Sequence, residues 1–275
     1  MSEWRFALPP SLGREPVRAR ARELAALLSD AGFATVWPQE SYTSLLSSLL
    51  AGEAHAAWGP PLACARVEAE GGVVALRGIR HGATTYRSVL IARVEDRLDL
   101  EKLPSLPRRP RAVWVDERSM AGYLMPRAWF REKGLVPEAI LREQRFLGSY
   151  VACLEAVLEG DADVTACFAP SPASSRPAAG LVDLIGFRAT DLRVLVTTGE
   201  CPNDGVVLSP LLDAAAREGV KTALARLVAD PRLRKPMGDL FDVEGFDVPP
   251  VGAYRSLLPL LDPANVTDDT PESRP

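Results

Sequence analysis

Hydrophobic residues at helical spacing, followed by a glycine and a short apolar run, occur twice along this chain. The first copy begins at Ser41 and the second at Ser149, and each opens with a Ser-Tyr pair. Leucines and valines then follow at spacings of three and four residues, which predicts an amphipathic helix capped by the serine. Gly52 and Gly160 suit the left-handed position that commonly ends a helix. We therefore expect two α/β lobes of similar construction.

The pattern between and around the two copies alternates short apolar runs with stretches of helical periodicity. Such alternation with short turns indicates parallel sheets with helices on their faces. Strands are expected at residues 5–8, 33–37, 73–76, 112–116 and 142–147, and helices at 14–28, 62–70 and 119–133. The predicted class is α/β, with two Rossmann-like lobes of parallel sheet that carry helices on both faces.

Two longer extended runs, residues 85–94 and 192–198, enclose the second series of strands and helices. The helical residues 208–261 then have only the strands of the first series left to cover. We therefore predict a discontinuous first lobe of residues 1–86 plus 199–262, a second lobe of residues 87–198, and two crossing strands that join them. Residues 263–275 are poor in apolar side chains and are predicted to be disordered. Open sheets of this kind bind ligands beyond the carboxyl ends of their strands, here between the lobes.

Composition narrows the class of partner. The 275 residues carry a net charge of −4, without the long basic face that nucleic-acid binding requires. No stretch approaches the roughly 20 apolar residues of a membrane span, so we expect no membrane insertion. The four cysteines are scattered and lack nearby histidines at ligand spacing, so we predict neither a metal site nor a cofactor. The start of the sequence lacks the pattern of a signal peptide and predicts a cytoplasmic protein, or a periplasmic one if an export signal was removed.

A set of short motifs extends over most of the chain. They are Tyr42 with its helix and Gly52-Glu53-Ala54, Gly59-Pro60, Tyr86-Arg87-Ser88, residues 116–122 with Pro126, Gly148-Ser149-Tyr150 through Asp163, and Cys201-Pro202-Asn203-Asp204. In these residues the chain resembles the family of phosphonate-binding transport proteins, which have the type II periplasmic-binding-protein fold. The resemblance implies a ligand between two lobes, with tyrosines of the family's site at Tyr42 and Tyr86.

The same resemblance shows where the ligand site departs from the family pattern. Phosphonate binders surround the anion with a Ser-Thr-Ser-Gly-like run, which here is Ser119-Met120-Ala121-Gly122. The histidine of the family's Gly-Ser-His motif corresponds to Tyr150. These changes make the site more apolar and aromatic, and a buried dianion with unpaired oxygens would be costly there. We therefore expect a small organic or peptide-like ligand that is partly apolar, with or without one anionic group, or else no tight small ligand at all.

The candidate ligand-binding residues are Ser11, Tyr42, Trp58, Tyr86, Ser88, Ser119, Met120, Ala121, Tyr150 and Asp204. Several have a purely structural alternative. Ser119 is also a good helix N-cap, the tyrosines at helix starts could be hydrophobic staples, and Trp58 could belong to the core. The free N–H groups at the helix start of Ser119 would suit a carboxylate or phosphate.

Three functions remain compatible with this sequence. The main hypothesis is a non-enzymatic binding protein that closes its lobes on a ligand and acts in the cytosol as a sensor, carrier or adaptor, with a protein partner as a further option. The first alternative is the solute-binding subunit of an ABC importer. The second is a biosynthetic enzyme on the same fold, although no catalytic residues are predicted. Asp116, Asp163 and Asp204 are the acids expected near the ligand.

Overall fold

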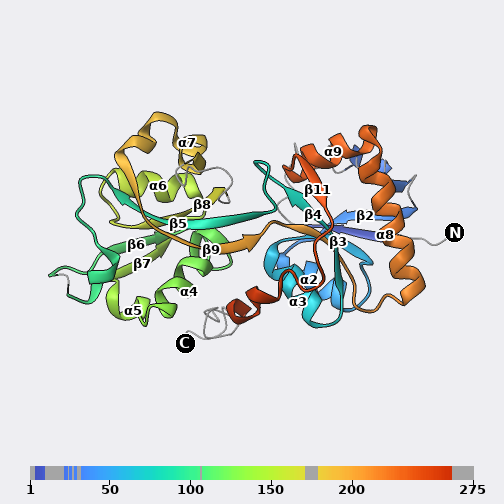
Figure 1. The fold of residues 1–275 in the computed structure, drawn as a ribbon, viewed down its shortest axis with the longest axis horizontal. Helices are drawn as coiled ribbons and strands as arrows, with labels where there is room; N and C mark the ends of the chain where they lie inside the picture. Colours follow the sequence, from blue (N-terminus) through green and yellow to red (C-terminus); the bar gives the residue numbers. More distant parts are fainter. Residues whose placement is uncertain are drawn as a thin grey trace. The chain divides into compact units, whose positions relative to one another are not determined.

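The computed structural model describes residues 4–9, 22–23, 25–26, 28–29, 32–105, 107–170 and 179–261. The chain divides into two compact units (Figure 1). The first contains Met1–Thr85 and Cys201–Pro259, and the second contains Tyr86–Glu200 and takes up the chain again at Leu260. The chain therefore passes between the units twice, once after Thr85 and once after Glu200. Ser11, most of the helix expected at 14–28, and the tail at 263–275 lie outside the described residues.

The first unit is built on a six-stranded sheet with the order β11-β4-β10-β3-β1-β2. The strands are β1 (Trp4–Leu8), β2 (Phe33–Pro38), β3 (Ala56–Gly59), β4 (Val73–Ile79), β10 (Gly205–Leu208) and β11 (Gly245–Asp247). β1 runs parallel to β2 and β3, whereas β10 runs antiparallel to both β3 and β4. The sheet is therefore mixed, which corrects the expectation of a parallel one. The antiparallel strand β10 lies just after the chain returns from the second unit.

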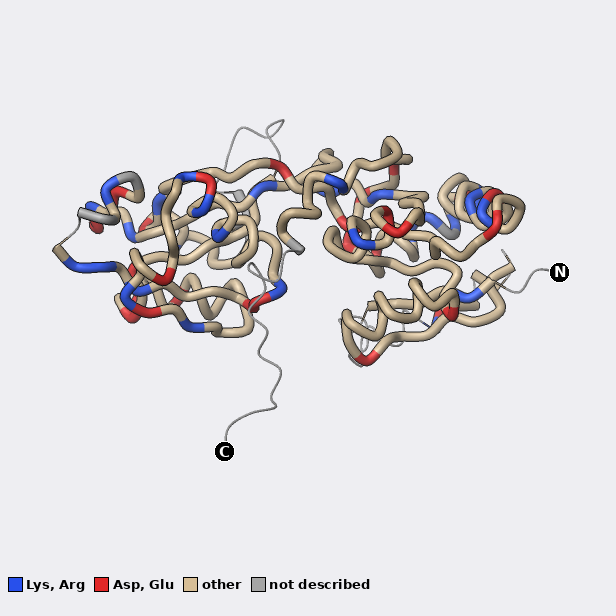
Figure 2. Tube along the Cα trace, turned by 90° about the horizontal axis from the view of Figure 1, so that it is seen from below, with Lys and Arg blue, Asp and Glu red and all other residues tan. Residues whose placement is uncertain are grey.

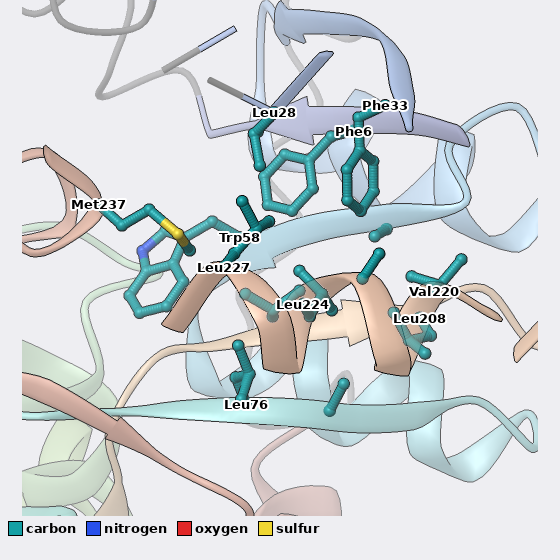
Figure 3. Close-up of a cluster of buried hydrophobic side chains, with 14 of the residues drawn as sticks. Phe6, Leu28, Phe33, Trp58, Leu76, Leu208, Val220, Leu224, Leu227 and Met237 are labelled. Atoms are coloured by element: carbon teal, nitrogen blue, oxygen red, sulfur yellow. The ribbon is translucent and has the colours of Figure 1, made fainter. Parts of the chain in front are cut away.

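The helices of the first unit are α2 (Tyr42–Leu50), α3 (Pro61–Ala69), α8 (Ala214–Ala229) and α9 (Pro231–Phe241). A hydrophobic core lies between the sheet and the two C-terminal helices, α8 and α9. α8 buries Val220, Leu224 and Leu227, whose spacing of four and three residues places them on one face of the helix. They pack with Phe6 and Phe33 from the sheet (Figure 3).

The second unit contains a three-stranded sheet of order β8-β5-β9 and a two-stranded parallel sheet of β6 and β7. Its strands are β5 (Thr85–Arg93), β6 (Arg111–Trp114), β7 (Glu143–Phe146), β8 (Thr165–Pro170) and β9 (Leu192–Pro202). Its helices are η2 (Leu100–Ser105), η3 (Met120–Leu124), α4 (Met125–Glu132), α5 (Pro137–Ile140), α6 (Tyr150–Leu158), α7 (Ala179–Ile185) and η4 (Gly186–Asp191), while η5 (Arg255–Leu261) ends the described chain. β5 and β8 are antiparallel, so this unit too departs from a purely parallel arrangement.

The two copies of the sequence pattern form the same structure. Ser41 accepts a hydrogen bond from the Ser44 N–H at the start of α2, and Ser149 accepts one from the Ala152 N–H at the start of α6. Both helices span nine residues, and Gly52 and Gly160 follow with φ of 72° and 80°. The prediction of two capped helices with left-handed glycine ends is confirmed.

In each unit, the strand that pairs in parallel with the one just before the helix carries an arginine, and the two arginines make equivalent contacts. Arg5 on β1 donates to the Gly52 carbonyl at 2.8 Å, and Arg111 on β6 donates to the Gly160 carbonyl at 2.6 Å. The backbone N–H of Arg5 also donates to His55 Nδ1 at 3.0 Å, as that of Arg111 donates to Asp163 Oδ2 at 2.7 Å. His55 therefore takes the structural place of the aspartate.

Acidic and basic residues are intermixed along the described chain of both units (Figure 2). This distribution agrees with the small net charge of −4. A search of the described helices found none long and apolar enough to cross a membrane.

Candidate functional site

The clearest association of predicted site residues lies in the second unit, where the chain leaves β6 and enters η3. Asp116 shapes this turn, because its carboxylate accepts from the Arg118 N–H at 2.8 Å and its carbonyl accepts from the Ser119 N–H at 3.0 Å. Ser119 is the N-cap of the helix, and its Oγ accepts from the Gly122 N–H at 3.2 Å. The predicted capping role of Ser119 is confirmed.

Tyr150 brings a second polar group to the same place. Its hydroxyl lies 3.4 Å from Ser119 Oγ, and its ring meets Phe168 edge-on with centroids 5.4 Å apart. Both Ser119 and Tyr150 are half-buried. Two hydroxyl groups from different helix starts thus lie side by side, next to the first backbone N–H groups of η3, which a helix leaves without intrahelical acceptors.

Met120 and Ala121 belong to the same turn but are buried, with only 7% and 2% of their surface exposed. The helix begins in a π conformation, in which the Leu124 N–H donates to the Ser119 carbonyl and the Met125 N–H donates to the Met120 carbonyl. Single π turns within helices are often found at functional sites. Little surface of either residue is therefore open to a ligand in this structure, and their contact with one stays a prediction.

Ser88 on β5 is fully buried and contacts the backbone of this turn. Its hydroxyl donates to the Ala121 carbonyl at 2.6 Å, and its N–H donates to Thr198 Oγ1 at 3.0 Å. In this structure the Ser88 hydroxyl supports the turn, and its direct contact with a ligand stays a prediction. Tyr86, two residues earlier, is half-buried and pairs in register with Pro170 of β8.

In the first unit, the candidate residues have different environments. Tyr42 is the first residue of α2, with 38% of its surface exposed. Trp58 is buried in the core and stacks on Phe241, with ring centroids 4.2 Å apart, which agrees with its structural alternative, a core position. Asp204 is paired with Arg80 at 2.8 Å, so its carboxylate is already engaged within this unit.

The acids that were expected near a ligand have structural roles. Burial alone would raise the pKa of Asp163, but hydrogen bonds from the side chain and backbone of Arg111, with the charges of Arg111 and Arg108, hold it below its usual value. Asp116 shapes the turn before Ser119, as described above. Within the described residues, a search for groups of three or more His, Cys, Asp or Glu that could hold a metal ion found none.

All four cysteines are buried. Desolvation raises the pKa of Cys153 to about 11 and that of Cys167 to about 12, and it raises the pKa of Cys64 as well. A thiol reacts as a nucleophile only when it is deprotonated and accessible. Cys64, Cys153 and Cys167 are therefore suited to packing.

A comparison with known protein families shows to which family the chain belongs. Residues 6–249 match the family described as "ABC transporter, phosphonate, periplasmic substrate-binding protein". The chain belongs to this family. Its description places such proteins in the periplasm, so it supports the importer alternative and does not support the cytosolic role that was our main expectation. No curated protein sequence matches the chain.

Several solved structures have this fold. XAC2383 from Xanthomonas citri, in a structure bound to ATP, has 17% identity and a TM-score of 0.73 over 97% of each chain. A binding protein component of an ABC phosphonate transporter from Pseudomonas aeruginosa has 18% identity and a TM-score of 0.67, covering 98% of this chain and 90% of the other.

PhnD1 from Prochlorococcus marinus, in complex with methylphosphonate, has 16% identity and a TM-score of 0.66, covering 96% of this chain and 98% of the other. Identities this low establish the fold alone. The predicted type II periplasmic-binding-protein fold is confirmed.

Two residues near the site were not singled out from the sequence. Thr198 is a buried polar residue at the end of an extended apolar run, and that contrast was the available signal. Phe168 supports the ring of Tyr150 from β8, and the sequence offered no comparable signal because an aromatic residue in a strand is ordinary core composition.

Proposed function

We propose that this protein is the solute-binding subunit of an ABC importer and works outside the cytosol with the importer's permease. The family match over residues 6–249 supports this role. The ligand would be an organic molecule with one anionic group, held in the second unit where Ser119 and Tyr150 meet. The 3.4 Å approach of their hydroxyls at a helix start is the observation that carries the proposal.

The chemistry of this turn favours an anion for two reasons. Backbone N–H groups at a helix start point outward, and the helix dipole places partial positive charge there. Ser119 and Tyr150 add hydroxyl donors, which are neutral and therefore match one anionic group better than a dianion that needs every oxygen paired.

The aromatic surroundings indicate what the rest of the ligand is like. The rings of Tyr150 and Phe168 pack edge to face beside the hydroxyl pair. Where a histidine stands in the family pattern, the chain has Tyr150, which adds apolar ring surface and removes a group that can carry positive charge. We therefore favour a carboxylate, or an organophosphonate in its singly charged form, with an apolar substituent over inorganic phosphate.

Native mass spectrometry of the purified protein tests for a bound small molecule. Calorimetric titration should then compare methylphosphonate, phenylphosphonate, benzoate and inorganic phosphate. Ser119→Ala and Tyr150→Phe should each weaken binding of the best ligand by about tenfold or more, since a hydrogen bond to a charged group contributes about 1.5–3 kcal/mol. Ser47→Ala, an exposed serine on α2 of the first unit, is the matched control.

Two results would contradict this proposal. One is a wild-type protein that carries no small molecule and binds none of the four compounds. The other is tight binding that neither Ser119→Ala nor Tyr150→Phe alters, because the anion would then be held elsewhere.

A further inference from the structure

The carbonyl of Ala121 lies at a point of the helix where backbone donors run out. The Leu124 N–H donates to the Ser119 carbonyl and the Met125 N–H donates to the Met120 carbonyl, each five residues apart. The next donor in this series would be residue 126, which is proline and has no N–H. Pro126 thus deprives the Ala121 carbonyl of its partner in the π turn.

Ser88 supplies the missing donor from a different element. Its hydroxyl donates to the Ala121 carbonyl at 2.6 Å, and the residue is completely buried, so water does not replace this bond. The N–H of Ser88 donates in turn to Thr198 Oγ1 at 3.0 Å. Ser88 lies on β5 and Thr198 on β9, the two strands that link the units.

We propose that Ser88 is a positioning residue for the ligand-binding turn. Its hydroxyl compensates for the donor that Pro126 removes and so holds the π conformation of η3. That conformation sets where the first N–H groups of the helix and the Ser119 hydroxyl lie. Through Thr198, the same residue joins the turn to both linking strands. The part of the inference that concerns a ligand rests on the proposed binding function, and the part that concerns the turn does not.

The relation between Ser88 and Pro126 gives a decisive set of variants. Ser88→Ala leaves a buried carbonyl unsatisfied and should lower the Tm by about 3 °C or more, given the cost of an orphaned acceptor. Pro126→Ala restores an N–H at residue 126 that can donate to that carbonyl. The double variant should therefore recover most of the loss, giving a strongly non-additive cycle.

Hydrogen exchange reports on the turn itself. In Ser88→Ala the Leu124 and Met125 amides should exchange about tenfold faster than in the wild type, and the double variant should restore their protection. Ser48→Ala, which removes a buried serine hydroxyl bonded to a carbonyl inside α2, is the matched control. Pro126→Ala should not rescue that variant. If Ser88→Ala does not accumulate as folded protein, recovery of folded protein in the double variant is the expected result.

Titration with methylphosphonate distinguishes the role of Ser88 in ligand binding from its role in the conformation of the turn. If the wild type binds it, Ser88→Ala should weaken binding about tenfold and the double variant should regain it. If the wild type does not bind it, that choice of ligand fails, while melting and exchange still decide the role of Ser88. Unchanged melting and exchange in Ser88→Ala, or losses that Pro126→Ala leaves uncorrected, would overturn the inference.

Discussion

Gly122 is the position of the binding turn where the structure allows the least change. A Cβ built on it would lie 2.6 Å from Val115 Cγ2, 2.8 Å from Val115 Cβ and 2.7 Å from Ser119 Oγ. All three distances are shorter than a carbon atom tolerates without displacement of its neighbour. Gly122→Ala should therefore push the Ser119 side chain away from both the Gly122 N–H and the Tyr150 hydroxyl.

The magnitude follows from three opposing terms. Overpacking of a tight site costs about 1–3 kcal/mol, and loss of a serine cap costs about 1 kcal/mol. Alanine in place of glycine in a helix returns about 1 kcal/mol. The expected net effect of Gly122→Ala is a loss of about 2 kcal/mol in the free energy of unfolding, together with weaker binding of any anion at Ser119.

Urea unfolding followed by circular dichroism measures this loss. Gly199→Ala is the control, because no atom beyond its two chain neighbours lies within 4 Å of the added Cβ there, and it should leave the unfolding midpoint nearly unchanged. Val115→Ala removes the shortest contact, so the Val115→Ala/Gly122→Ala pair should lose less than the sum of the single changes. A Gly122→Ala protein as stable as Gly199→Ala would refute the close packing described for this turn.

Three further predictions concern residues away from the turn. Burial and then the charge of the neighbouring arginine lower the pKa of His55, so stability should fall as the pH drops below about 6.5. In the His55→Asp variant, the loss of stability should occur only below about pH 4, as is expected for the equivalent Asp163. Urea unfolding at pH 7 and at pH 5 measures the difference. Trp58→Phe should reduce stability by about 1–2 kcal/mol without changing ligand affinity in calorimetry, whereas a loss of affinity would return it to the site. Cys153 and Cys167 should react with a thiol reagent at pH 8 only after unfolding, and rapid labelling of native protein would contradict their burial.

The elements that the sequence predicted well are those with local causes. The helix starts at Ser41 and Ser149 depend on a side chain that bonds a backbone N–H three residues away, and the ends at Gly52 and Gly160 depend on a backbone conformation that glycine favours. Each signal lies within one turn of the residue it affects, so no tertiary information is needed.

The direction of the strands and the orientation of single side chains required the three-dimensional structure. The apolar run of β10 reads the same whether it pairs parallel or antiparallel, and only its position after the return from the second unit decides the matter. Trp58 is in the core because Phe241, far along the chain, stacks on it. Ser88 on β5 is buried and donates to the Ala121 carbonyl of η3, and that contact crosses two elements.

The repeated pattern also limits what an internal repeat can say about function. In both units an arginine donates to the carbonyl of the glycine that ends the helix, and its N–H donates to a side chain three residues beyond that glycine. The acceptor is a histidine in one unit and an aspartate in the other, so the contact needs only an acceptor atom and tolerates a change of charge. The turn at Ser119 depends instead on particular groups, namely the missing N–H of Pro126 and the hydroxyl of Ser88 that compensates for it. The repeat therefore indicates how the two lobes fold. The chemistry of the ligand has to be inferred from contacts that only one of the units makes.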